Sequence, residues 1–77
     1  MNDSRRKIIL YIASKIKEFG KDLEDIKSEE QKSFNNRSEN SKSNESATKS
    51  ELAISCLNEA LASLNKAVDK AEEATDF

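Results

Sequence analysis

Few residues in this sequence could support acid–base or metal chemistry. The chain has no histidine, the commonest general base and metal ligand. Adjacent carboxylates occur at Glu29-Glu30 and Glu72-Glu73, but neighbours on a helix point about a third of a turn apart and do not converge. The single cysteine, Cys56, has no basic neighbour on its own helix that would favour a thiolate. We therefore expect no enzymatic activity, no cofactor and no metal site.

A group of basic residues is the one candidate for nucleic-acid contact: Arg5, Arg6, Lys7, Lys17 and Lys21. Glu18, Asp22 and other acidic residues are interleaved with them, and the net charge of -2 gives no overall attraction to a phosphate backbone. Solvated helix faces are the simpler interpretation. A nucleic-acid-binding regulator in the manner of Rop is therefore kept only as the alternative function, on analogy of fold.

Length and composition indicate one domain made of long helices. The chain has 77 residues, 36% of them charged and 35% hydrophobic, with one glycine and no proline. No apolar run is long enough to span a bilayer, and one cysteine cannot form an internal disulfide. These features predict a cytoplasmic protein without a membrane partner.

The C-terminal part of the chain predicts a helix over residues 48–75. Thr48 and Glu51 have the spacing of a capping box, which places the start of the helix near Thr48. The following apolar residues alternate in steps of three and four, as in a coiled-coil seam: Ile54, Leu57, Leu61, Leu64, Val68 and Ala71.

The N-terminal part predicts a second helix with the same period, over residues 4–33. Its seam residues are Ile9, Ile12, Ile16, Phe19, Leu23 and Ile26. Gly20 lies in the middle of this helix, where glycine costs roughly 1 kcal/mol relative to alanine. Because the seven-residue pattern continues through Gly20, we expect a site of close helix approach rather than a break.

A polar connection at residues 35–46 joins the two helices. Because this connection is short compared with the helices, they must run antiparallel. Matching the two seams places Phe19 opposite Leu61 and Ile16 opposite Leu64. The basic start of the first helix then lies beside the acidic end of the second. The predicted fold is an all-α, antiparallel two-helix coiled-coil hairpin.

Small and apolar residues beside the two seams widen each apolar stripe: Ile8, Ala13, Gly20, Ala53, Ala60, Ala67 and Ala74. A chain of 77 residues is near the lower limit for an independent core. We therefore expect these residues to mediate self-association into a dimeric four-helix bundle.

Residues 25–36, with the sequence DIKSEEQKSFNN, resemble a pattern found in small acidic proteins of phages and prophages. The resemblance implies a phage or prophage origin and a helical hairpin, and it carries over no functional residue. Together with the absence of catalytic residues, it predicts a small non-enzymatic interaction protein with a second copy, or a host or phage protein, as its partner.

Overall fold

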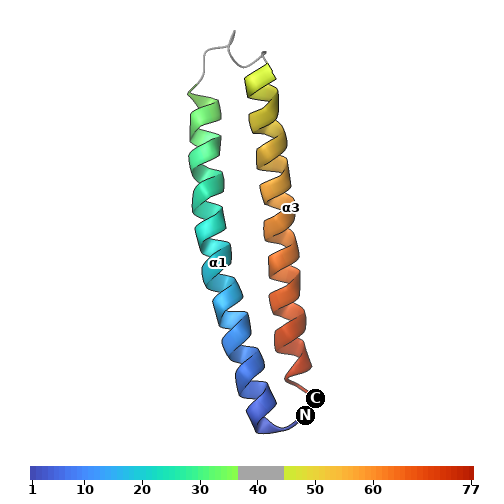
Figure 1. Cartoon of the computed structure of the whole chain (residues 1–77). Coiled ribbons are helices and arrows are strands. Elements are labelled where there is room, and N and C mark those ends of the chain that lie inside the picture. Colours follow the sequence, from blue (N-terminus) through green and yellow to red (C-terminus); the bar gives the residue numbers. More distant parts are fainter. Residues whose placement is uncertain (37–44) are drawn as a thin grey trace.

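Two long helices make up the part of the chain that the computed structural model describes, residues 1–36 and 45–77. Helix α1 (Asp3–Asn35) and helix α3 (Glu45–Ala74) lie side by side and run in opposite directions, with both chain ends at one end of the rod (Figure 1). The Cα atoms extend over 59 × 15 × 12 Å. The predicted helical hairpin is confirmed, whereas most of the predicted connection, residues 37–44, lies outside the described residues.

Helix α1 begins and ends within two residues of the prediction. The side chain of Asn2 caps its start by accepting a hydrogen bond of 2.8 Å from the backbone N–H of Arg5. At its end, the backbone N–H of Asn36 donates to the carbonyl of Lys32 over 3.0 Å. The helix continues through Gly20 without a break, as expected.

Helix α3 starts at Glu45, three residues before the predicted Thr48. Thr48 therefore lies inside the helix, and its interpretation as the capping residue is wrong. Glu45 places a carboxylate in the first turn, where the helix dipole favours it, and pairs with Lys49 at 3.3 Å. These local interactions extend the helix beyond the capping-box pattern.

The predicted seam of α3 is confirmed. Its residues are buried or half-buried in steps of three and four, and the series also includes Ala47, Ser50 and Thr75: Ala47, Ser50, Ile54, Leu57, Leu61, Leu64, Val68, Ala71 and Thr75. At the open end of the hairpin, Arg6 Nε donates to the carbonyl of Thr75 over 3.0 Å. The amino group of Met1 donates to the carbonyl of Phe77 over 2.7 Å. The first turn of α1 therefore lies beside the last turn of α3.

The predicted seam of α1 is only half right. Ile9, Ile16 and Leu23 are half-buried as predicted, but Ile12, Phe19 and Ile26 are 48%, 65% and 55% exposed. Their expected places in the seam are occupied by Ala13, Gly20 and Lys27. At Ala13 and Gly20 the physical reason is size, because small residues leave room for α3, and Leu64 lies over Gly20. Lys27 is instead half-buried along its aliphatic part, and its amino group pairs with Glu24 at 3.1 Å.

The core of this hairpin is thin. Among the described residues, the buried apolar side chains are those of Ala13, Ala47 and Val68, and no large side chain is fully buried. Large apolar side chains are instead left exposed to water: Met1, Ile8, Leu10, Tyr11, Ile12, Phe19, Ile26, Leu52 and Phe77. A single copy of the chain therefore leaves much of its apolar surface uncovered.

Candidate functional site

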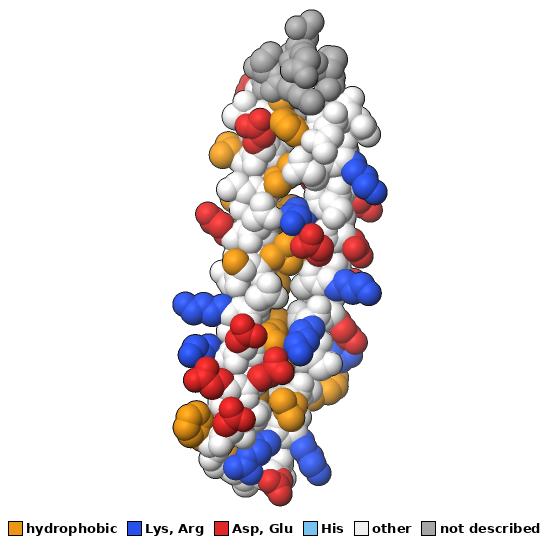
Figure 2. All heavy atoms as spheres, turned by 180° about the vertical axis from the view of Figure 1, so that it is seen from behind, with side chains coloured by type: hydrophobic (Ala, Val, Ile, Leu, Met, Phe, Trp, Pro, Cys, Tyr) orange, Lys and Arg blue, Asp and Glu red, His pale blue; other side chains and the backbone are white. Residues whose placement is uncertain are grey.

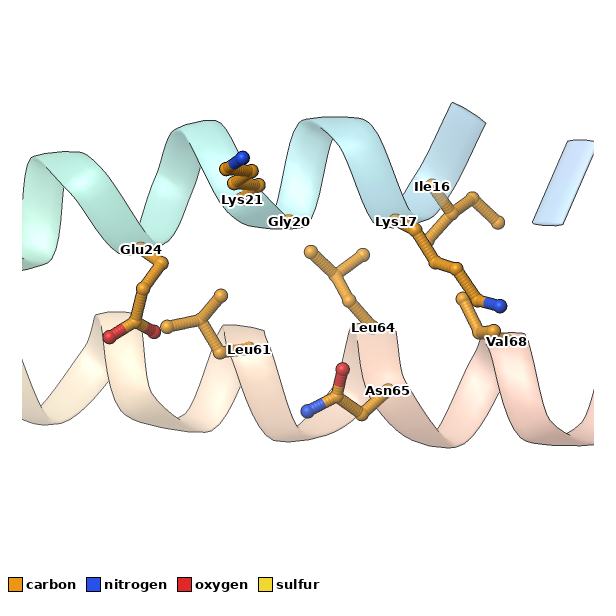
Figure 3. A pocket seen from close by; sticks show the side chains of 9 residues that line it. All are labelled: Ile16, Lys17, Gly20, Lys21, Glu24, Leu61, Leu64, Asn65 and Val68. Carbon is orange, nitrogen blue, oxygen red and sulfur yellow. The ribbon is translucent and has the colours of Figure 1, made fainter. Parts of the chain in front are cut away.

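A groove between the helices surrounds Gly20, and Figure 3 shows its lining. The side chain of Leu64 points toward Gly20, while Ile16 and Val68 close one end of the floor and Leu61 the other. Lys17, Lys21, Glu24 and Asn65 form a polar rim. The groove measures about 280 Å³, and Gly20 contributes no side chain to it.

The rim of this groove does not form a catalytic arrangement. Lys17 Nζ lies 3.4 Å from Glu72 Oε1 and joins the two helices by an ion pair. Glu24 Oε1 lies 3.1 Å from Lys27 Nζ on its own helix. The acidic groups of the rim are thus occupied by lysines, and no pair of carboxylates converges there. The groove is therefore an unfilled space between the helices with a polar rim, and its side chains are not arranged for catalysis.

Replacing Gly20 with alanine should stabilise the protein. A Cβ atom at this position would lie 3.9 Å from Leu64 Cδ1, an ordinary van der Waals contact. The better helix propensity of alanine should add about 1 kcal/mol to the free energy of unfolding in urea. Ser14→Ala, at an exposed position of the same helix, should add about half of that. A loss of stability in Gly20→Ala would show that the helices pack more tightly here than described.

The groove also fixes which flank of the hairpin each stripe occupies. Residues two positions apart on an α-helix point about 200° apart. Phe19 therefore lies on the opposite flank of α1 from Lys17 and Lys21, which line the groove. On α3, Ala67 is likewise two positions from the groove residue Asn65. The large apolar stripe of α1 and the alanine stripe of α3 thus share the flank away from the groove.

We call this shared flank the apolar face: Ile8, Ile12, Phe19 and Ile26 of α1, with Ala53, Ala60, Ala67 and Ala74 of α3. Counting along the helices from the contact of Gly20 with Leu64 places Phe19 near the height of residue 65, between Ala60 and Ala67. In the same way Ile26 lies between the heights of Ala53 and Ala60, and Ile12 between those of Ala67 and Ala74. Each large residue of α1 is therefore level with the space between two alanines of α3.

The surface is not apolar all round. Figure 2 shows a face over which Lys, Arg, Asp and Glu side chains are spread across both helices, with hydrophobic side chains in a narrow band between them. Ion pairs within each helix, such as Lys15–Glu18 at 3.2 Å and Lys70–Glu73 at 3.1 Å, organise part of this charge. Exposed pairs of this kind contribute little to stability. The apolar face therefore contrasts with the charged face that Figure 2 shows.

The residues predicted to mediate self-association fall into two groups. Ala13 is 2% exposed and Gly20 faces Leu64, so both already pack against α3 within the chain. The others lie on the apolar face, where Ala60 and Ala74 are half-buried and the remaining members are exposed: Ile8, Ala53 and Ala67. Sequence reasoning missed Ile12, Phe19 and Ile26 as members of this surface, because it assigned them to the seam. The signal was their size beside Ala13 and Gly20.

The basic residues predicted for nucleic-acid contact are dispersed. Arg6 Nη1 pairs with Asp3 at 2.9 Å, in addition to its hydrogen bond to Thr75, and Lys17 pairs with Glu72. Lys21 lies on the groove rim, while Arg5 and Lys7 are exposed near the start of α1. Two of these five basic residues, Arg6 and Lys17, therefore already pair with other groups of the chain. Nucleic-acid binding stays a prediction.

Within the described residues, the cysteine and the carboxylates form no metal site. Cys56 is exposed. Over residues 1–36 and 45–77, no group of three or more His, Cys, Asp or Glu side chains is arranged to hold a metal ion. Neither described helix has a stretch long and apolar enough to cross a membrane.

Comparison with known proteins adds no relative to this description. No protein-family model matches the chain, and no curated protein or solved structure matches it at a significant level. The resemblance of residues 25–36 to phage proteins is thus not tested by these comparisons and stays a prediction.

Proposed function

We propose that this protein is a non-enzymatic helical interaction protein, of phage or prophage origin, that associates with a second copy through its apolar face into a four-helix bundle. The observation that carries the proposal is the exposure of Ile12, Phe19 and Ile26 beside the alanine stripe of α3. Large apolar side chains grouped on one face of a small protein are characteristic of an interface. A second copy supplies a matching surface because it presents the same large and small stripes.

The thinness of the core supports the same conclusion. A two-helix hairpin leaves one side of each seam residue open to water, and here only three apolar side chains of the described residues are buried. Small domains with little core gain stability by oligomerising. The apolar face supplies the additional surface, since its members lie next to the seam on both helices.

Thermal unfolding over a hundredfold range of protein concentration tests this proposal. Binding at a hundredfold excess over the dissociation constant stabilises the folded state by about 2.7 kcal/mol. The unfolding midpoint should therefore rise by several degrees across the range. A midpoint independent of concentration, with cooperative unfolding, would overturn the proposal.

Two matched alanine variants sharpen the test. Ala67→Glu places a charge on the apolar face, and it should remove most of the concentration dependence. Ala62→Glu introduces the same charge at another exposed alanine of α3, three residues before Asn65 and so on the groove side. This control should keep the concentration dependence. Equal behaviour of the two variants would place the contact elsewhere.

The nucleic-acid alternative predicts a different response. A regulator that uses Arg5, Lys7 and Lys21 would shift labelled RNA or DNA in a gel, and the shift would weaken steeply with salt. Our proposal predicts no such shift at physiological salt. A salt-sensitive shift that is lost in Arg5→Gln with Lys7→Gln would favour the alternative.

A further inference from the structure

We infer that the two copies associate about a two-fold axis parallel to the helices, so that α1 of each copy lies on α3 of the other and both connections are at the same end. This inference rests on the proposed self-association and specifies its geometry. Two arrangements bring the apolar faces together with two-fold symmetry. An axis along the rod places α1 over the partner's α3, whereas an axis across the rod places α1 over the partner's α1.

The sizes of the facing side chains distinguish these arrangements. With the axis along the rod, heights are unchanged, so Phe19 of each copy stands over the space between Ala60 and Ala67 in the other. Ile12 meets the space between Ala67 and Ala74, and Ile26 the space between Ala53 and Ala60. Large residues then fill the space left by small ones, which is how helices interdigitate at high density.

The other arrangement packs less well. With the axis across the rod, the stripe of α1 meets itself in reverse, and Phe19 faces the second Phe19 near the centre. The alanine stripes of the two α3 helices would face one another. Helix spacing depends on the side chains at the contact. The two α1 helices, with large side chains between them, would therefore have to lie farther apart than the two α3 helices, with alanines between them. A rigid hairpin cannot satisfy both distances at once.

Charge at the edge of the face agrees with the first arrangement. Glu29 lies three residues after Ile26, and Lys49 lies four residues before Ala53, so each flanks its own stripe on the side away from the seam. The axis along the rod brings Glu29 of one copy to the same edge and the same end of the bundle as Lys49 of the other, whose ion pair with Glu45 of its own chain is exposed. Both side chains are exposed in the single chain. They occupy the positions where flanking charges set orientation in helical bundles.

Distance measurement between spin labels tests the orientation. Cys56→Ser removes the single native thiol, and Ser33→Cys then provides one labelling site near the connection, on an exposed position of α1. Ser33 is 14 residues from Phe19, so an axis across the rod would separate the two labels by about 42 Å along the bundle. An axis along the rod keeps the two labels at the same height. Only the width of the bundle then separates them, below about 30 Å for neighbouring helix axes 8–10 Å apart.

A second label at the opposite end makes the result unambiguous. Ser4→Cys, also exposed and also in the Cys56→Ser background, lies near the start of α1. We expect a short distance, below about 30 Å, at both sites. Distances above about 40 Å at both sites would overturn the orientation while leaving self-association intact. No dipolar coupling between copies, in protein with an unchanged helical spectrum, would overturn both the orientation and the proposed function.

Discussion

Phe19→Glu should raise the dissociation constant of the proposed dimer by about a hundredfold or more. Phe19 is 65% exposed in the single chain and stands at the centre of the apolar face. Burying a phenylalanine contributes about 1.5–3 kcal/mol, and two-fold symmetry counts the loss twice. Since about 1.4 kcal/mol corresponds to a factor of ten in affinity, the change exceeds two factors of ten. Sedimentation velocity over a dilution series measures this constant.

Tyr11→Glu is the matched control for this experiment. Tyr11 is an aromatic residue of the same helix with nearly the same exposure, 63%. Its ring forms a cation–π interaction with Lys15, whose Nζ lies 5.6 Å from the ring centroid. It lies two residues before the buried Ala13, so it points away from α3 and outside the apolar face. This variant should leave the dissociation constant within about a factor of three. Equal weakening by the two variants would contradict the assignment of the interface to Phe19.

Ala13→Glu should abolish most of the helical structure of the chain. Ala13 is 2% exposed and packs against α3, so the substitution places a carboxylate in the seam, and the lysine four residues on, Lys17, is already paired with Glu72. Burying an unpaired charge costs several kcal/mol. The total stability of a small domain is only about 5–15 kcal/mol. Circular dichroism at 222 nm should therefore show a large loss of signal at room temperature.

Ser14→Glu controls for the effect of the new charge on helix propensity. Ser14 is the next residue and is exposed, so its carboxylate remains in water. We expect the spectrum of this variant to match that of the unchanged protein. If Ala13→Glu also kept a full helical spectrum and an unchanged free energy of unfolding, Ala13 would not lie in the seam.

The seam of α3 could be predicted from the sequence because its apolar residues have one consistent spacing and no competing stripe of similar size. Ile54 through Ala71 all lie where the pattern places them. The antiparallel arrangement also followed from the pattern, since only one polar connection separates two helices of the same period. Local hydrophobic periodicity was sufficient for these features.

The rotation of α1 could not be predicted by the same reasoning. Residues at steps of three and four form a stripe whether the seam uses Ile12 and Phe19 or Ala13 and Gly20, because both sets alternate with Ile9 and Ile16. Hydrophobicity favours the larger residues, whereas close packing of two helices favours the smaller ones. In this chain the smaller residues face α3, and Leu64 lies over Gly20. The large residues are consequently displaced onto the flank.

The apolar face was predicted only in part. The alanines at seven-residue intervals indicated a flank of α3, but the sequence does not state on which side of the hairpin that flank lies. The Lys17–Glu72 ion pair and the groove residues supplied this information, because they mark the opposite side. The start of α3 at Glu45 could not be predicted either. The capping-box pattern at Thr48 and Glu51 indicated a helix start three residues later.

Self-association through the apolar face is tested most directly by sedimentation equilibrium of the unchanged protein at tens of micromolar. We expect an average mass close to twice the 8.6 kDa of one chain. Phe19→Glu should reduce this mass toward 8.6 kDa, whereas Tyr11→Glu should not. A folded species of 8.6 kDa over the whole concentration range would show that the apolar face does not join two copies.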